Sequence, residues 1–297
     1  MSAGRCGLVA VIGRPNVGKS TLINAIMGRK ISIVTAKPQT TRHRILAVHT
    51  TDEAQIIFVD TPGIHRKAGK AMNRLMNRTA AHALADADAI LFVTDATQWT
   101  PEDDDALKRV RQAGTPVVAV LNKIDRVHPK ERLLETIGQM AARHDFAEIV
   151  PVSALRRDNL DQLLAVLPAF LPESPPLFPA DMHTDRSREF QAAEIIREKL
   201  TLMLHQELPY GLTVQIERFV EDDQGININA IIWVERDSQK GIVVGKRGAV
   251  LKRVGTAARL ELKEQLGIRV HLELWVKVKS NWADNEADLA NLGYEAP

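Results

Sequence analysis

Residues 13–20 constrain this chain more than any other segment. They match the pattern G-x-x-x-x-G-K-[ST], in which glycines let successive backbone N–H groups converge on one anion. An apolar run at 8–12 precedes the loop and a helix-like run at 21–27 follows it, which is the strand–loop–helix order that the motif requires. The pattern predicts a nucleotide-phosphate site built from Gly13, Arg14, Pro15, Asn16, Val17, Gly18, Lys19, Ser20 and Thr21. Within it, Lys19 is expected at the outer phosphates and Ser20 at Mg²⁺.

The composition indicates a globular protein of about two domains. The chain has 297 residues, and its apolar content of 45% is sufficient for ordinary cores. Cys6 is the single cysteine, so no disulfide can form within the chain, and this favours a reducing compartment. No apolar run reaches the roughly 20 residues of a membrane span, and the first residues lack the apolar stretch of a secretion signal. We therefore expect a cytoplasmic protein.

Strand-like and helix-like segments alternate through residues 1–172, the first predicted domain. Strands are expected at 7–12, 45–49, 55–60, 89–94, 117–122 and 148–152, and helices near 19–28, 72–86, 101–113, 130–144 and 158–170. This alternation is typical of an α/β fold with a mostly parallel sheet and helices on both faces. Four prolines then fall within residues 171–179, so residues 173–188 are predicted to be a linker.

A different order of elements follows in residues 189–280, the second predicted domain. A helical pattern extends from Glu189 to Gln206, and period-two alternation marks strands near 213–217, 226–231 and 269–278. A further helix is expected from about Val250 to Leu266, after a glycine-containing loop. The order helix–strand–strand–helix–helix–strand predicts an α+β domain, and residues 281–297 are left as a C-terminal tail.

Three more motifs stand at the carboxyl ends of predicted strands, where ligands of open α/β sheets bind. Asp60, Thr61, Pro62 and Gly63 form the first, with a carboxylate for Mg²⁺ and an N–H for a γ-phosphate. In the second, Asn122-Lys123-Ile124-Asp125, Asp125 can accept hydrogen bonds from the N1–H and 2-amino group of guanine, which adenine lacks. Asn122 would tie this loop to the phosphate loop, and the Lys123 stem would cover the base. The third motif is Ser153, Ala154 and Leu155, where the Ala154 N–H can meet guanine O6.

With these motifs the first domain resembles the Ras-like GTPases, in particular their translation-factor-related branch. The resemblance implies GTP and GDP as ligands and a threonine that closes over Mg²⁺, for which Thr41 is the first choice and Thr40 the reserve. Ras carries a catalytic glutamine directly after Asp-x-x-Gly, whereas this chain has Ile64, so we expect slow intrinsic hydrolysis. GTPases with Pro-Asn-x-Gly-Lys in the loop use the asparagine to hold K⁺, so Asn16 either ligates K⁺ or only shapes the turn. The residues that resemblance and motif together assign to catalysis are Lys19, Asn16, Thr41 and Gly63.

The second domain carries a G-x-x-G loop with two cations at its centre. The loop and the following helix supply the predicted RNA-binding residues Gly245, Lys246, Arg247, Gly248 and Lys252. Residues 173–297 are net acidic, with 16 basic and 20 acidic side chains, yet residues 236–279 contain 11 basic and 4 acidic ones. This local positive charge suits a phosphate backbone. The loop and the element order resemble a KH domain in its bacterial, type II arrangement, which clamps about four nucleotides of single-stranded RNA. Trp233 and Trp275 lie in strand patterns and are expected in the core.

Taken together, the chain resembles the bacterial ribosome-assembly GTPases that join one GTPase domain to a C-terminal KH domain. The resemblance implies binding near the 3′ end of small-subunit (16S) ribosomal RNA, assistance in 30S subunit maturation, a monomer, and a weak peripheral association with the inner membrane. Two alternatives remain open at this point: an RNA-binding protein in which GTP is only a structural ligand, and a P-loop phosphotransferase acting on a small acceptor.

Overall fold

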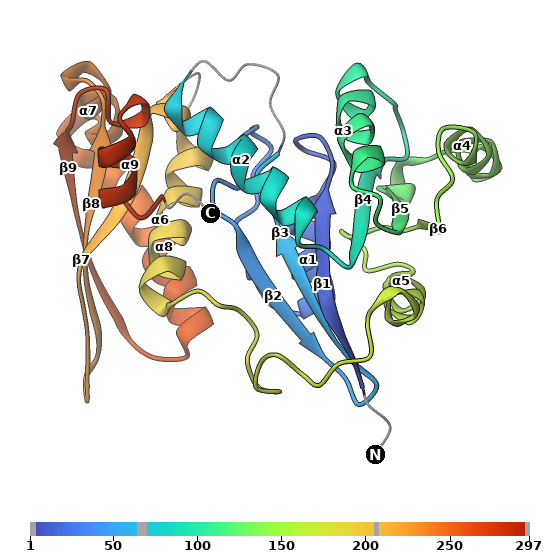
Figure 1. Cartoon of the computed structure of the whole chain (residues 1–297). Coiled ribbons are helices and arrows are strands. Elements are labelled where there is room, and N and C mark those ends of the chain that lie inside the picture. Colours follow the sequence, from blue (N-terminus) through green and yellow to red (C-terminus); the bar gives the residue numbers. More distant parts are fainter. Residues whose placement is uncertain (1–3, 64–69, 205–207, 295–297) are drawn as a thin grey trace. The chain divides into compact units, whose positions relative to one another are not determined.

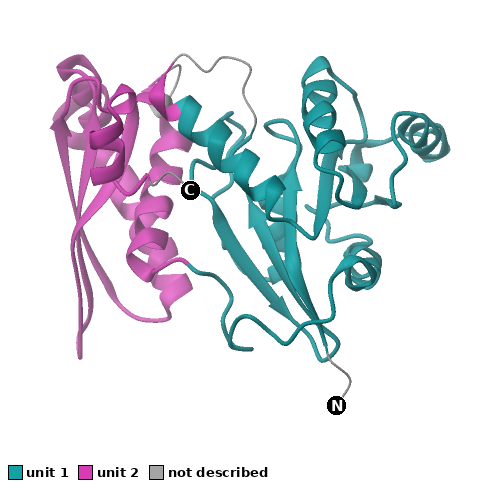
Figure 2. Ribbon diagram, viewed as in Figure 1, with its two compact units in different colours: residues 1–68, 73–185, 297 teal, residues 69–72, 186–296 magenta. Residues whose placement is uncertain are grey.

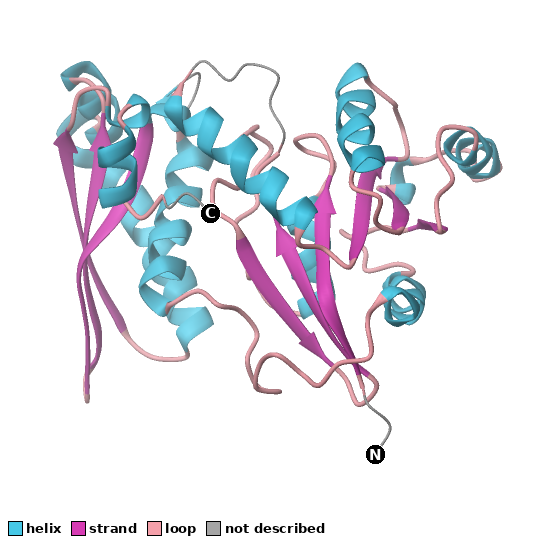
Figure 3. Cartoon of the chain, in the orientation of Figure 1, coloured by secondary structure: helices cyan, strands magenta, loops and turns pink. Residues whose placement is uncertain are grey.

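The computed structural model describes residues 4–63, 70–204 and 208–294. The chain divides into two compact units (Figure 2), of which unit 1 contains residues 1–68, 73–185 and 297 and unit 2 contains residues 69–72 and 186–296. Unit 1 has the α/β fold expected for the first part of the chain, and unit 2 has the α+β fold expected for the second (Figure 3).

A six-stranded sheet with the strand order β2-β3-β1-β4-β5-β6 forms the centre of unit 1 (Figure 1). Its strands are β1 (Arg5–Ile12), β2 (Ile45–Thr50), β3 (Ala54–Asp60), β4 (Ala89–Asp95), β5 (Val117–Asn122) and β6 (Glu148–Pro151). Only β2 is antiparallel to its neighbour; the other paired strands run parallel. The mostly parallel sheet is therefore confirmed.

Helices cover both faces of this sheet, which explains why its central strands are apolar along their whole length. The helices of unit 1 are α1 (Lys19–Met27), α2 (Ala71–Ala85, of which residues 73–85 belong to this unit), α3 (Pro101–Gln112), α4 (Arg132–Ala141) and α5 (Leu160–Val166). Side chains of α1 and α5 pack with Val9 and Val11 on one face. Side chains of α2, α3 and α4 pack with Ala10 and Ile12 on the other. The carboxyl ends of β1, β3 and β5 meet at one edge, so the sheet brings the predicted nucleotide motifs together.

The chain leaving α5 continues along unit 1 instead of leaving it. Buried Gln55 of β3 accepts hydrogen bonds from the backbone N–H groups of Leu177 and Phe178, and its amide donates to the Phe178 carbonyl at 2.8 Å. Further on, Val48 of β2 donates its N–H to the His183 carbonyl at 3.0 Å. The free edge of β2 is thus partly covered by residues that the sequence suggested as linker.

Unit 2 has a three-stranded sheet of order β7-β8-β9 with helices on one face. The strands are β7 (Leu212–Asp222), β8 (Gly225–Val234) and β9 (Val270–Val278), and the helices are α6 (Arg188–Met203), α7 (Asp237–Val244), α8 (Ala249–Leu266) and α9 (Glu286–Asn291). β7 and β8 are antiparallel, whereas β8 and β9 are parallel. Apolar side chains of α6, α7 and α8 pack on the sheet in one core. Within the described ranges, none of the helices combines the length and apolar character needed to cross a bilayer.

Three tryptophans of unit 2 depart from simple expectations. Trp275 is 41% exposed, so its predicted place in the core is wrong. Trp233 is likewise predicted in the core, but it is only half-buried and donates to Gln215 Oε1 at 2.9 Å, while its neighbours Ile232 and Val234 belong to the core. Alternation along β9 turns Leu274 and Val276 toward the helices and therefore turns Trp275 to the opposite face. Trp282, which follows β9, is fully buried, donates to the Gly211 carbonyl and stacks on Tyr294. The C-terminal segment accordingly belongs to the core of unit 2.

Candidate nucleotide and RNA sites

The phosphate loop lies between β1 and α1, and two of its glycines are required by close packing. A Cβ atom on Gly13 would lie 2.2 Å from the Val93 carbonyl oxygen. Gly18 has φ 101°, and a Cβ atom there would lie 2.4 Å from the Asn122 side-chain nitrogen. A side chain at either position would therefore displace the loop from β4 or from the base-recognition motif.

Lys19 is the first residue of α1, and its ammonium group turns back into the loop. Its Nζ donates to the carbonyls of Gly13 at 2.9 Å and Arg14 at 3.1 Å, and only 7% of the residue is exposed. Burial lowers the pKa of Lys19 to about 8, from an ordinary value near 10.5. A cation that is costly to hold in this position is well placed to transfer to an anionic phosphate.

Three oxygen-bearing side chains meet beside the loop. Ser20 Oγ donates to Asp60 Oδ2 at 2.9 Å and shares a 3.0 Å hydrogen bond with Thr41 Oγ1. Asp60 is fully buried, and burial raises the pKa of its carboxyl group. Its second oxygen has no hydrogen-bond partner in the described part of the chain. Two hydroxyls and a carboxylate with a spare buried oxygen are a donor set that suits Mg²⁺.

Thr40 and Thr41 have different surroundings. Thr40 Oγ1 donates to the Lys37 carbonyl at 2.7 Å and pairs with Thr35 Oγ1 at 2.6 Å, so it is held inside its own loop. Thr41 alone of the two reaches Ser20. The structure therefore favours the first choice of the sequence analysis as the metal-side threonine.

Asn122, at the end of β5, ties three loops together. Its Nδ2 donates to the Val17 carbonyl at 2.9 Å, and its Oδ1 accepts from the N–H groups of Lys123 at 2.8 Å and Ala154 at 3.0 Å. The residue is 2% exposed. The Ala154 N–H, expected at guanine O6, is thus donated to Asn122 in this structure, and the contact with O6 remains a prediction.

Asp125 lies in the turn after β5 and faces the third motif. Its Oδ1 accepts a 2.6 Å hydrogen bond from Ser153 Oγ, and this bond lowers the pKa of the Asp125 carboxyl group below its ordinary value. Asp125 is thus a carboxylate at neutral pH, which is the form that accepts hydrogen bonds from guanine. Leu155, the last residue of the third motif, is 72% exposed.

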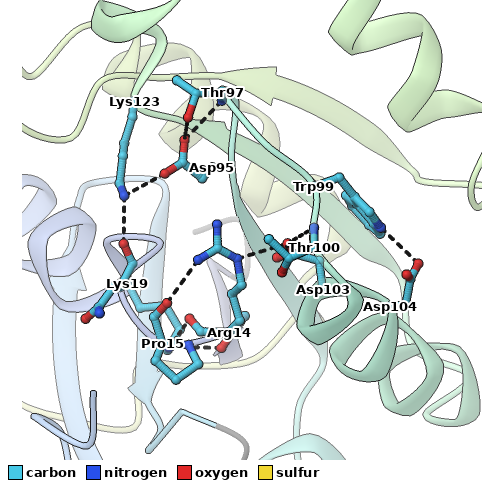
Figure 4. Close-up of polar contacts among 12 residues, drawn as sticks. Arg14, Pro15, Lys19, Asp95, Thr97, Trp99, Thr100, Asp103, Asp104 and Lys123 are labelled. Atoms are coloured by element: carbon cyan, nitrogen blue, oxygen red, sulfur yellow. Dashed lines mark hydrogen bonds and ion pairs between the residues drawn. The ribbon is translucent and has the colours of Figure 1, made fainter. Parts of the chain in front are cut away.

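Lys123 connects the base motif to the phosphate loop through an acid that the sequence analysis missed. Its Nζ donates to the Asn16 carbonyl and to Asp95 Oδ2, both at 2.7 Å (Figure 4). Burial opposes ionisation of Asp95, but hydrogen bonds from Lys123 and Thr97 lower its pKa overall. Asp95 could have been found from the sequence, because it is an aspartate at the carboxyl end of β4, at the same sheet edge as the other motifs.

These loops enclose a cavity of about 400 Å³. Of the predicted residues, those lining it are Pro15, Asn16, Gly18, Lys19, Ser20, Thr21, Thr40, Thr41, Gly63 and Lys123. Gly13, Val17, Asp60, Thr61 and Asn122 are buried behind the wall, where Thr61 Oγ1 donates to the Val11 carbonyl at 3.0 Å. Arg126 and residues 33–37 also line the cavity and were not predicted to do so. Ile64, the position of the missing glutamine, lies outside the described residues.

The G-x-x-G loop of unit 2 lies between α7 and α8, as predicted. Gly245 and Gly248 have φ 72° and 76°, and Arg247 between them also has positive φ. A second cavity of about 390 Å³ adjoins the loop and is lined by Gly248, Leu251, Lys252, Gly255, Thr256, Arg259, Leu272 and Leu274. Two predicted RNA contacts, Gly248 and Lys252, therefore border a groove between α8 and β9.

A phosphate loop at the carboxyl edge of a mostly parallel sheet, joined to Asp-x-x-Gly and Asn-Lys-x-Asp loops, defines a P-loop GTPase, here followed by a KH unit. Residues 8–123 match the family described as 50S ribosome-binding GTPase, and residues 207–283 match the KH domain. GTPase Era of Xylella fastidiosa is 52% identical over 98% of both chains, and GTPase Era of Cronobacter sakazakii is 48% identical over 97% of this chain and 96% of the relative. The chain belongs to the Era family of GTPases.

Two solved structures share the whole fold. A variant of Era from Aquifex aeolicus bound to GDP·AlF4⁻ superposes with a TM-score of 0.93 at 42% identity, covering 98% of this chain and 99% of that one. Era in complex with MgGDPNP and nucleotides 1506–1542 of 16S ribosomal RNA gives a TM-score of 0.94 at 41% identity, with the same coverage.

Proposed function

We propose that this protein is a GTP-hydrolysing switch that binds 16S ribosomal RNA near its 3′ end and assists maturation of the 30S subunit. The observation that carries the nucleotide half is the convergence of the phosphate loop, Thr41, Gly63 and Lys123 on one cavity, with Asn122 joining the loops behind its wall. The RNA half is supported by the relative whose complex contains nucleotides 1506–1542 and by the cationic G-x-x-G loop.

In the proposed nucleotide complex, Lys19 leaves the two loop carbonyls for the outer phosphates. The N–H groups at the start of α1 bind the phosphates, because a helix N-terminus carries partial positive charge. Ser20, Thr41 and Asp60 would hold Mg²⁺, and their mutual contacts and the spare Asp60 oxygen fit that ion. Bound there, the ion neutralises charge on the β- and γ-phosphates. Mg²⁺ in the complex of the relative supports this assignment.

Asp125 is proposed to select guanine. Adenine offers no donors opposite this carboxylate, and leaving a buried polar group unpaired is how a site rejects an analogue by roughly 10⁴-fold. Calorimetric titration with GDP and ADP tests the assignment; comparable affinities for the two nucleotides would refute it.

Hydrolysis is proposed to be slow and assisted by K⁺ at Asn16. The Asn16 amide donates to the Ala36 carbonyl at 2.9 Å, which places this side chain at the boundary between the phosphate loop and the loop containing Thr41. Positive charge beside the transferred phosphate is what the chain needs without a glutamine after Gly63. Equal rates of GTP hydrolysis in KCl and NaCl buffers would show that Asn16 only shapes the turn.

RNA is proposed to bind at Gly245, Lys246, Arg247, Gly248 and Lys252. Single-stranded RNA laid in the groove beside α8 would meet glycines that admit the backbone and side chains that neutralise it. Replacing Lys246 and Arg247 by alanine should weaken binding of a 16S 3′-end oligonucleotide. The slope of log K against log salt concentration should become less steep by about 1.4, because two phosphate contacts are lost. Unchanged affinity and slope would exclude this loop.

The two sites are proposed to be coupled, so that GTP and RNA each tighten binding of the other. Crosslinking of RNA to the protein with GTP or GDP bound, followed by sequencing, tests the RNA site and its nucleotide dependence together. A Lys19→Ala variant is the matched control: retention of full RNA-dependent function in cells would instead favour a structural role for GTP.

Three further proposals concern the domain bounds, the oligomeric state and the localisation, and the last two are supported by the family resemblance alone. The sequence predicts a GTPase domain at 1–172, a linker at 173–188, a KH domain at 189–280 and a tail at 281–297. We propose that the GTPase domain extends to residue 185, because residues 177–183 bond to β2 and β3, and that the KH domain includes the C-terminal segment, because Trp282 is buried in unit 2. We also propose a cytoplasmic monomer and a weakly membrane-associated fraction. Light scattering and fractionation of cell lysates at low and high salt test the monomer and the membrane association.

A further inference from the structure

A buried ion pair supports the phosphate loop from behind. Arg14 Nε donates to Asp103 Oδ2 at 2.9 Å, and the two residues are 8% and 0% exposed (Figure 4). Asp103 belongs to the first turn of α3, where the same oxygen accepts from the N–H and the hydroxyl of Thr100, both at 2.9 Å. The capped end of α3 is therefore attached to the phosphate loop by one side chain.

This pair is poorly arranged for stability. Arg14 Nη2 and Asp103 Oδ1 are both buried, and neither has a hydrogen-bond partner among the residues that the structure describes. Buried ion pairs with unsatisfied atoms contribute little net stability, and apolar replacements of similar volume are often as stable. Net stabilisation of the fold therefore does not explain this ion pair, and we look for its role in the phosphate loop.

The two residues after Arg14 contact three of the other nucleotide loops. A Cβ atom on Gly63 would lie 3.1 Å from the Pro15 ring, so the two loops are in close contact there. Asn16 donates its amide to the Ala36 carbonyl and accepts Lys123 Nζ on its own carbonyl. Arg14 also donates to the Pro15 carbonyl at 3.4 Å. The backbone from which Pro15 and Asn16 make these contacts is thus anchored to α3 through the Arg14 side chain.

We propose that Arg14 and Asp103 are positioning residues for GTP hydrolysis, which fix the first half of the phosphate loop on α3 so that Pro15 and Asn16 stay in place against Gly63 and residue 36. This inference rests on the proposed nucleotide site. Neither side chain lines the proposed nucleotide cavity, so both would act through the backbone of residues 14–16.

Lys19 Nζ joins the two halves of the loop in this structure by bonding to the carbonyls of Gly13 and Arg14, but in the proposed nucleotide complex it leaves them for the phosphates. The backbone of the second half then has supports of its own. Gly18, Lys19 and Ser20 are held by α1 and by the Asn122 contact with Val17. These residues and Asp125 supply the proposed contacts to GDP. The half held by Arg14 faces Gly63, the proposed γ-phosphate contact. Loss of the pair should therefore reduce kcat much more than the affinity for GDP.

The experiment compares Arg14→Met, Asp103→Asn and the double variant in the full chain. Each single variant leaves one buried charge unpaired and should lower the thermal midpoint of the nucleotide-free protein by at least about 5 °C. The double variant removes both charges, and its asparagine keeps an acceptor for Thr100, so most of the thermal midpoint should return. Asp104→Asn is the matched control, because Asp104 is the exposed neighbour that accepts from Trp99 Nε1.

The decisive readout is hydrolysis in the double variant. We expect kcat to stay about 10- to 100-fold below that of the unchanged protein, because misplaced catalytic contacts cost rates of this order, while GDP affinity changes less than about threefold. Recovery of kcat together with the midpoint, or a loss of GDP affinity equal to the loss of kcat, would overturn the inference. Lys19→Ala distinguishes the outcomes, since unchanged GDP and GTP affinity in that variant would mean that the proposed site itself is wrong.

Discussion

Replacing Asn122 by alanine should destabilise unit 1 and weaken guanine-nucleotide binding together. The substitution removes hydrogen bonds to Val17, Lys123 and Ala154 from a residue that is 2% exposed. Each such bond contributes about 0.5–1.5 kcal/mol, and buried partners left unpaired move the total toward the upper end. We expect a loss of about 3 kcal/mol in the free energy of unfolding, or about 6–12 °C in the midpoint of a unit of this size.

Differential scanning calorimetry of the nucleotide-free chain measures the midpoint, and titration with GDP measures the affinity. Asn24→Ala is a matched control, because Asn24 also makes three hydrogen bonds, to the Ser32 carbonyl and to the N–H groups of Ile31 and Ser32. Both variants should lose stability, but only Asn122→Ala should lose about tenfold or more in GDP affinity. A midpoint within about 2 °C of the unchanged protein, or equal affinity losses in the two variants, would refute the reasoning.

Three further predictions follow from particular contacts. Asp125→Asn should lower GDP affinity by about 100-fold or more and favour xanthosine nucleotides, whose ring offers an acceptor in place of the 2-amino group; competition binding checks this. Because the Lys19 pKa is lowered to about 8 and phosphate would raise it, nucleotide binding should take up a proton, and affinity should fall as pH rises from 7 to 9; calorimetry in buffers of different ionisation enthalpy measures it, and Lys19→Met should show no such uptake. Trp282→Ala should destabilise unit 2 by about 3–5 kcal/mol in urea unfolding, whereas Trp275→Ala on the exposed face should cost less than about 1 kcal/mol.

The sequence predicts most of unit 1 because its strands are buried on both faces and are therefore apolar throughout. β1, β3, β4 and β5 begin and end within two residues of their expected positions. Three of the four nucleotide motifs follow such strands directly, so parallel topology alone places them at one edge. The choice between Thr40 and Thr41 needed the structure, because only the fold of the intervening loop decides which hydroxyl meets Ser20.

What the sequence left undetected depends on distant or very short features. The Arg14–Asp103 contact joins residues 89 positions apart, and no local pattern indicates it. Helix α9 spans only six residues, too few for a clear period, although Asn285 is a recognisable cap that accepts from two N–H groups. The exposure of Trp275 could have been predicted from the sequence, because the polar residues His271, Glu273 and Lys277 lie with it on the same face of the strand.

The covering of β2 by residues 183–185, where Asp185 Oδ1 also accepts the Leu46 N–H at 3.0 Å, matters to any study of unit 1 in isolation. Cutting the chain after Pro172 would strip the Leu177 and Phe178 backbone from Gln55 and the His183 carbonyl from Val48. An uncapped outer strand invites pairing with a second molecule. A fragment that ends after Asp185 keeps these bonds, so the practical limit of an autonomous GTPase fragment lies about a dozen residues beyond the point where the proline-rich stretch begins.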